Sequence, residues 1–182
     1  MQKAVEVLQD SGVILTPTDT TFGLSCLAFD KNAVRKLNQI KHRPENKSYI
    51  LLVESEAHLQ RYVEVPDLAW DLIDLSEKPI TLVYDKIRDL PAHLISPEGT
   101  IAIRVVKEPI LFKIIQKVKQ PLISTSANIA GAASPQRFDE ISKEILDEVD
   151  YVLPETTTFI PKFPSSTLVQ LSHDHSVKVL RS

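Results

Sequence analysis

Hydrophobic and polar positions along this chain alternate between the helical period and the strand period. Residues 3–10 carry apolar side chains at helical spacing, and Gly12 is expected to end this helix in a left-handed conformation. Short apolar runs rich in branched residues predict strands. These strands are expected at residues 13–15, 49–53, 80–84, 100–105, 122–125, 167–171 and 177–180.

Amphipathic segments between the apolar runs predict helices at residues 33–41, 56–62, 67–75, 109–117 and 139–149. Asp30 or Asn32 caps the first of these, and Pro44 prevents it from continuing. Alternating strands and helices predict an α/β fold, and the consecutive strands near the C-terminus predict some antiparallel pairing. We therefore expect a twisted mixed sheet with flanking helices, in a single domain that spans residues 1–182.

Composition limits the classes of function. The 182 residues are 43% hydrophobic and 25% charged, without a membrane-spanning apolar tract or a basic-then-apolar leader, which predicts a soluble, cytoplasmic protein. The only cysteine, Cys26, lies in an apolar stretch and is expected to be buried, so neither a disulfide framework nor a zinc cluster forms within one chain. A net charge of −3 argues against coating nucleic acid by charge alone. The four glycines are too far apart for a phosphate-cradling loop, so side chains must hold any nucleotide.

Three polar clusters are candidate ligand sites, since ligands gather at strand ends in α/β sheets. Residues 16–21 supply four hydroxyls and a carboxylate, although such residues also stabilise turns. Residues 41–47 include three cations suited to an anion, although cations at a helix end also complement its dipole. Residues 124–131 offer hydroxyls and an amide suited to phosphates or an amino acid, or a cap for the next helix.

Arg104 lies inside the apolar strand at residues 100–105. It faces either solvent or a pocket in which its guanidinium pairs with a carboxylate, such as that of an amino acid. The residues alone thus indicate a polar, cation-lined anion pocket.

The histidines form no evident catalytic or metal-binding set. His42, His58 and His93 are interpreted as surface residues. His173 and His175 lie two residues apart but lack further metal ligands nearby.

Six segments occur in a characteristic order: PTDTTFGL at 17–24, KHRP at 41–44, GTIAIRV at 99–105, STSAN at 124–128, STLV at 166–169 and LR at 180–181. Together they resemble the YrdC-like threonylcarbamoyl-AMP synthase family in its short form, from about Gly12 to Arg181. The resemblance implies a mixed α/β fold around a large concave basic pocket. It also implies that the chain makes threonylcarbamoyl-AMP and pyrophosphate from ATP, L-threonine and bicarbonate or CO2.

By this resemblance, Lys41 and Arg43 are the catalytic cations, and Arg104 binds the carboxylate of L-threonine. The implied ATP contacts are Arg43, Lys47, Thr100, Ser126, Asn128, Ser134 and Arg181. The implied L-threonine contacts are Thr18, Thr20, Arg104 and Ser124. Mg²⁺ is expected to arrive with ATP, without a metal site of the protein. Leu52 stands where some longer members carry a histidine.

The resemblance further implies a partner, a threonylcarbamoyl transferase complex that acts on tRNA. Two other functions stay open. One is a YciO-like relative without synthase activity, against which the retained Lys41, Arg43, Ser126 and Asn128 argue. The other is an RNA-binding module with affinity for tRNA or double-stranded RNA, against which the negative net charge and the 6% aromatic content argue.

Overall fold

The computed structural model describes residues 1–44, 48–172 and 176–182, and their strands form one mixed sheet. The strand order is β7-β1-β2-β6-β3-β5-β4-β8-β9. The strands are β1 (Ile14–Pro17), β2 (Phe22–Leu27), β3 (Ile50–Val53), β4 (Ile80–Tyr84), β5 (Ile101–Val105), β6 (Leu122–Ser126), β7 (Tyr151–Val152), β8 (Thr167–Leu171) and β9 (Val177–Arg181). β3 and β5 are parallel, whereas β8 and β9 are antiparallel, so the predicted mixed sheet is confirmed.

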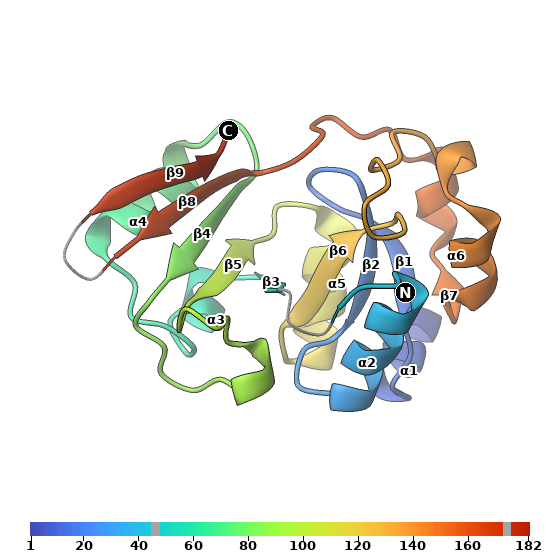
Figure 1. Cartoon of the computed structure of the whole chain (residues 1–182), viewed down its shortest axis with the longest axis horizontal. Helices are drawn as coiled ribbons and strands as arrows, with labels where there is room; N and C mark the ends of the chain where they lie inside the picture. Colours follow the sequence, from blue (N-terminus) through green and yellow to red (C-terminus); the bar gives the residue numbers. More distant parts are fainter. Residues whose placement is uncertain (45–47, 173–175) are drawn as a thin grey trace.

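Helices cover both faces of this sheet. They are α1 (Gln2–Gln9), α2 (Lys31–Ile40), α3 (Glu56–Leu59), α4 (Asp67–Leu75), α5 (Pro109–Val118) and α6 (Lys143–Glu148), with 3-10 turns η1 (Ala92–Leu94), η2 (Phe138–Glu140) and η3 (Pro154–Thr158). Figure 1 shows α1, α2, α5 and α6 in one half of the molecule and α3 and α4 in the other. The connection from η3 to β8 crosses between the halves (Figure 1). None of the helices in the described residues is long and apolar enough to cross a membrane.

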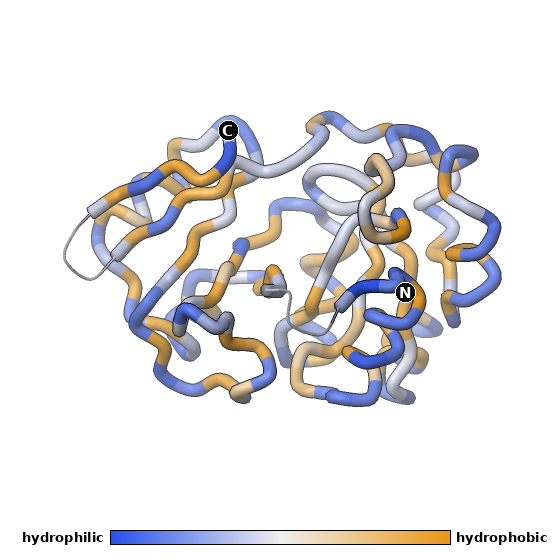
Figure 2. The backbone as a smooth tube through the Cα atoms, viewed as in Figure 1, coloured by the Kyte–Doolittle hydropathy of each residue, from blue (hydrophilic) through white to orange (hydrophobic). Residues whose placement is uncertain are grey.

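Side chains that alternate along the strands form two hydrophobic cores, one on each face of the sheet. The larger core joins α2, α3, α4 and α6 to residues such as Leu51 and Ile103, and it contains the buried Cys26, as predicted. The smaller core joins α1 and α5 to residues such as Leu52 and Leu122. Figure 2 shows the central strands as largely hydrophobic. On the face of the sheet that carries the smaller core, the polar strand residues that α5 does not cover can form a site.

Several local predictions are wrong for physical reasons. Ser11, with φ of 58°, takes the left-handed position after α1 that we expected of Gly12. Gly12 is instead required by close packing, because a Cβ there would lie 2.5 Å from Val7 Cγ1. The helix expected at residues 139–149 begins only at Lys143, where Ser142 caps it. Strands β2 and β7 were not predicted as strands.

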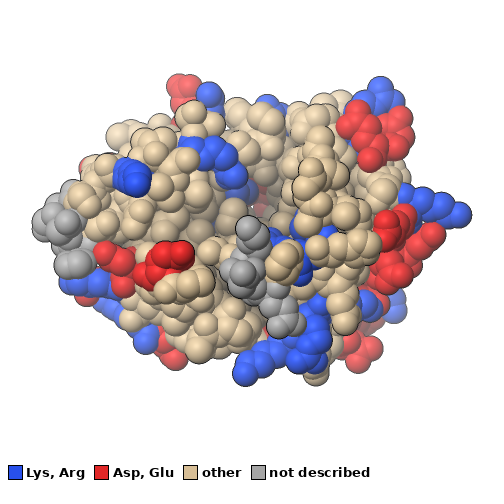
Figure 3. Space-filling model, in the orientation of Figure 1, with Lys and Arg blue, Asp and Glu red and all other residues tan. Residues whose placement is uncertain are grey.

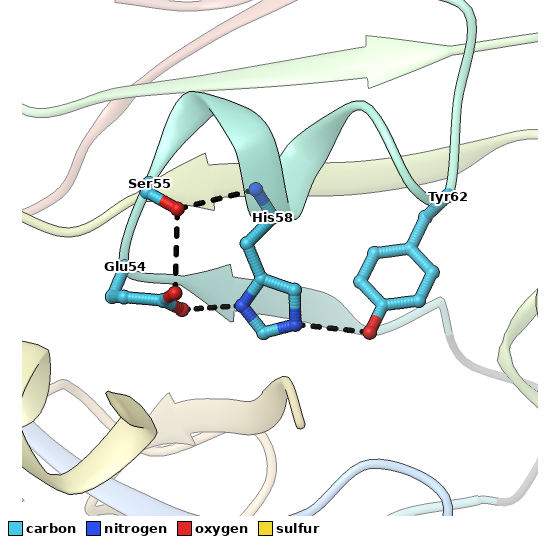
Figure 4. A network of polar contacts seen from close by, with 4 residues as sticks. All are labelled: Glu54, Ser55, His58 and Tyr62. Carbon is cyan, nitrogen blue, oxygen red and sulfur yellow. Dashed lines mark hydrogen bonds and ion pairs between the residues drawn. The ribbon is translucent and has the colours of Figure 1, made fainter. Parts of the chain in front are cut away.

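His58 is also not the surface residue that the sequence suggested, since it is only 4% exposed. Figure 4 shows its ring between Glu54, which pairs with Nδ1, and Tyr62, whose hydroxyl lies 2.9 Å from Nε2. Ser55 caps α3 by accepting a hydrogen bond from the His58 amide at 3.1 Å (Figure 4). Because both ring nitrogens have partners, this histidine fastens α3 to the loop after it. His42 is exposed, as expected, and His93 is partly buried.

Candidate active site

A cavity of about 210 Å³ collects most of the predicted site residues. Figure 3 shows a hollow between the two halves of the molecule, with basic side chains on both sides of it. Among the residues that the structure describes, its lining includes three arginines and no carboxylate. The predicted residues that line it are Thr18, Thr20, Arg43, Arg104, Ser124, Ser126, Ser134 and Arg181. This composition favours an anionic ligand that also accepts or donates hydrogen bonds through hydroxyls.

The turn between β1 and β2 forms one wall. The Thr18 hydroxyl donates to the Thr21 carbonyl at 2.7 Å and accepts from the Thr20 amide at 3.1 Å. These residues therefore do stabilise the turn, which was one of the two roles considered from the sequence. The same hydrogen bonds hold Thr18 and Thr20 at the cavity. Gly23 permits the close approach, since a Cβ there would lie 2.5 Å from Thr18 Cγ2 and 2.8 Å from Ser124 Oγ.

Lys41 lies behind the wall that Ser126 forms, and it is not itself a lining residue. It is 4% exposed, and its ammonium donates to the carbonyls of Ser126 at 2.5 Å and Asn128 at 2.7 Å. The Ser126 hydroxyl in turn pairs with the Asn128 carboxamide oxygen. Burial and, less strongly, the charge of Arg43 lower the pKa of Lys41 to about 8. The side chain thus places a partly desolvated cation beneath the segment at 126–128.

Arg43 brings a second cation to the cavity. Its guanidinium lies 5.2 Å from the centroid of the Tyr49 ring and also donates to the carbonyl of Ser48. A weaker contact joins Nη1 to Thr125 Oγ1 at 3.4 Å. Burial lowers the pKa of this arginine, because its charge is less completely solvated inside the protein than in water. A bound anion would compensate for this lost solvation.

Arg104 faces the cavity rather than solvent, which decides between the two alternatives left open by the sequence. It is 7% exposed, and it donates from Nε to Thr81 Oγ1 at 3.0 Å and from Nη2 to Ser166 Oγ at 2.9 Å. Burial lowers its pKa to about 10, although the charge of Asp19 opposes this shift. Among the described residues, Nη1 has no hydrogen-bond partner. A ligand carboxylate at Nη1 would therefore meet a buried guanidinium whose other two nitrogens, Nε and Nη2, are held by hydrogen bonds.

Arg181 reaches the same cavity because β9 contains an irregularity. Val179 pairs with Val169, but Arg181 pairs with Leu168, so Leu180 is an extra residue in β9. A bulge of this kind reverses which face the following side chains occupy. Arg181 therefore turns onto the face of Arg104, where its Nε donates to the Ser166 carbonyl at 3.1 Å.

Two predicted contacts, Thr100 and Asn128, do not line the cavity. Thr100 is hydrogen-bonded to Ser96, 2.8 Å between hydroxyls, and is not a lining residue of the cavity. Asn128 is also not a lining residue and donates to the carbonyls of Ile129 and Ala132. Lys47 lies outside the described residues, as do His173 and His175.

Comparison with known protein families identifies the family to which this fold belongs. The Sua5/YciO/YrdC family model, described as "Telomere recombination", matches residues 6–182. This chain belongs to the Sua5/YciO/YrdC family. It is 31% identical over 156 residues to the threonylcarbamoyl-AMP synthase of Pseudoalteromonas translucida, which covers 84% of this chain and 83% of that protein.

Two solved structures of this family are similar to the whole fold. E. coli YciO gives a TM-score of 0.83 at 25% identity and covers 99% of this chain and 87% of that protein. P. abyssi Sua5 in complex with L-threonine gives a TM-score of 0.80 at 25% identity. That match covers 93% of this chain and 50% of Sua5, so the chain spans half the length of that relative. The family membership predicted from the sequence motifs is confirmed.

Within this Sua5/YciO/YrdC chain, sequence reasoning missed Ser166 as a site residue. Ser166 is 1% exposed as a whole residue, yet it lines the cavity and contacts both Arg104 and Arg181. The signal was present in the STLV segment, which carried the resemblance but received no role. Thr81 was missed as well, because it looks like an ordinary strand residue.

Proposed function

We propose that this chain is an L-threonylcarbamoyladenylate synthase, which makes threonylcarbamoyl-AMP and pyrophosphate from ATP, L-threonine and bicarbonate or CO2. The observation that carries the proposal is the convergence of three arginines and a set of hydroxyls in one cavity whose described lining residues include no carboxylate. The threonylcarbamoyl-AMP synthase similar to this chain, and the Sua5 relative bound to L-threonine, support the same reaction.

In this proposal, L-threonine binds at the Arg104 end of the cavity. Its carboxylate pairs with Nη1 of Arg104, and Thr18, Thr20 and Ser124 bond the remaining polar atoms. The neutral amine adds to CO2 with release of a proton, or condenses with bicarbonate with release of water. The resulting carbamate oxygen attacks the α-phosphorus of ATP, and pyrophosphate leaves. The protein has to hold this nucleophile in line with the α-phosphate, since positioning supplies much of the rate in phosphoryl transfer.

ATP binds beside Arg43, Ser126, Ser134 and Arg181. Arg43 neutralises phosphate charge as pyrophosphate leaves, while Lys47, Thr100 and Asn128 remain proposed ATP contacts. Lys41 acts through the backbone, because its ammonium holds the carbonyls of Ser126 and Asn128 and adds positive potential beneath the nucleotide. Mg²⁺ enters as the ATP complex, with the triphosphate oxygens as its ligands.

The product is a mixed anhydride that must reach an acceptor before water hydrolyses it. We propose that a threonylcarbamoyl transferase complex takes it in the cytoplasm and modifies tRNA. The test is product analysis: the purified chain is incubated with Mg-ATP, L-threonine and isotopically labelled bicarbonate. Label and adenylate should appear in one threonine-dependent product. A labelled adenylate that forms equally well with L-alanine would overturn the assignment of L-threonine.

A further inference from the structure

Thr81 lies outside the cavity but contacts two residues that line it. It is on β4, fully buried at 0% exposure, and is not a lining residue. Its Oγ1 lies 3.0 Å from Nε of Arg104 and 2.8 Å from the hydroxyl of Ser166. Burying a hydroxyl in a strand is unfavourable unless it is hydrogen-bonded, and here both of its partners, Arg104 and Ser166, line the cavity.

The guanidinium nitrogens donate in each of their contacts with these hydroxyls. Ser166 Oγ accepts from Nη2 of Arg104 at 2.9 Å and from Nη2 of Arg181 at 3.2 Å. Thr81 Oγ1 accepts from Nε of Arg104. Thr81 and Ser166 share a further hydrogen bond, in which either hydroxyl can be the donor. Thr81 therefore bonds Arg104 directly and also bonds the acceptor that both arginines share.

Two positively charged guanidiniums, those of Arg104 and Arg181, donate to the single hydroxyl of Ser166. The charge of Arg181 contributes to lowering the pKa of Arg104, after the larger effect of burial. Ser166 offers both of them an acceptor, and the hydrogen bond between the two hydroxyls lets Thr81 hold that acceptor in place. If Thr81 lost its oxygen, the Arg104 Nε–H and the Ser166 hydroxyl would each lose a hydrogen-bond partner.

We propose that Thr81 is a positioning residue, which orients Arg104 directly and Ser166 through its hydroxyl so that Nη1 of Arg104 faces the bound carboxylate. This inference rests on the proposed function for the identity of the ligand, L-threonine. It extends that function by assigning the alignment of the carboxylate site to a residue that does not touch substrate. Through Ser166, the same hydroxyl also connects Arg104 to Arg181.

The chain supplies a matched set of variants. Thr81→Val is nearly isosteric and removes the acceptor, whereas Thr81→Ser keeps it. Thr16→Val is the control, because Thr16 is also a fully buried strand threonine, but its Oγ1 has no hydrogen-bond partner among the described residues. A misaligned Nη1 loses up to one hydrogen bond to the charged carboxylate, which contributes about 1.5–3 kcal/mol, or roughly ten-fold to more than a hundred-fold in affinity.

The test is calorimetric titration with L-threonine, together with the KM values for L-threonine and ATP in pyrophosphate release. Thr81→Val should weaken L-threonine binding and raise its KM by about ten-fold, at the lower end of the range set by the loss of that bond. The KM for ATP should change by less than about two-fold, because Arg181 keeps its hydrogen bond to the Ser166 carbonyl. Thr81→Ser should restore the threonine KM, and Thr16→Val should match the wild type.

The outcomes separate this inference from the proposed function. Equal threonine affinity in Thr81→Val and wild type, in an active enzyme, would overturn the positioning role alone. Equal losses for L-threonine and ATP, accompanied by a lower melting temperature, would show that Thr81 is only structural and would also overturn it. L-threonine that binds without supporting turnover would overturn the proposed function, while calorimetry still tested Thr81. A wild-type chain that does not bind L-threonine would overturn both.

Discussion

Replacing Arg104 should separate substrate binding from stability. Arg104→Met removes the guanidinium but leaves an unbranched side chain to fill the space on β5. Thr81 and Ser166 remain hydrogen-bonded to each other across 2.8 Å, so the substitution leaves no polar atom of theirs wholly without a partner. The loss therefore falls on the ligand, whose carboxylate no longer meets Nη1.

The size of the effect follows from the environment of Arg104. A hydrogen bond to a charged group contributes about 1.5–3 kcal/mol, so one lost bond weakens binding by roughly ten-fold to more than a hundred-fold. Burial lowers the pKa of Arg104 to about 10, which means that the empty site holds this charge at a cost. Arg104→Met should accordingly leave the melting temperature unchanged or higher.

The assay is steady-state pyrophosphate release with L-threonine varied at saturating ATP. Arg104→Met should raise the threonine KM by about thirty-fold, and Arg104→Lys should raise it less, because a lysine keeps the charge but not the geometry. Arg35→Met is the control, since Arg35 is exposed on α2 and does not line the cavity. An unchanged threonine KM in Arg104→Met would refute the assignment of Arg104 to the carboxylate.

Three further predictions concern other parts of the site. Arg43→Ala should raise the KM for ATP by ten-fold or more, because a charged hydrogen bond of about 1.5–3 kcal/mol is lost; an unchanged KM would remove Arg43 from the ATP site. Lys41 loses its proton as pH rises through its pKa of about 8, so binding of a non-hydrolysable ATP analogue should weaken by up to about ten-fold per pH unit above that value. The pH dependence should be absent in Lys41→Met, and affinity that stays constant to pH 10 in the wild type would contradict the role of its charge. Gly23→Ala should raise the threonine KM and destabilise the fold by about 1–3 kcal/mol in chemical denaturation, because the new Cβ clashes with Thr18 and Ser124; wild-type values of both would show that the turn gives way.

Sequence patterning predicted most of the fold because the sheet is buried on two faces by helices with clear apolar sides. β3, β4, β5, β6 and β8 are found within one residue of their predicted positions. Strand β2 escaped prediction because Gly23 and Ser25 interrupt its apolar pattern where the second face carries the site. The two-residue strand β7 is too short to leave a pattern of its own.

The candidate site could be predicted less completely than the fold from local sequence patterns. Arg104 could be identified from the sequence because a cation inside an apolar strand is unusual, and in the structure its side chain lines the cavity. The position of Arg181 depends on the bulge at Leu180, and nothing in the local sequence reveals a register shift between two strands. The position of Lys41 behind the wall depends on tertiary packing, so the sequence could identify the cation but not its carbonyl partners.

The most direct test of the central claim is threonine-dependent pyrophosphate release by the purified chain with Mg-ATP and bicarbonate. The proposed function predicts that release requires L-threonine and bicarbonate together and that L-alanine does not replace L-threonine. A folded chain that binds ATP but releases no pyrophosphate on addition of L-threonine would contradict it.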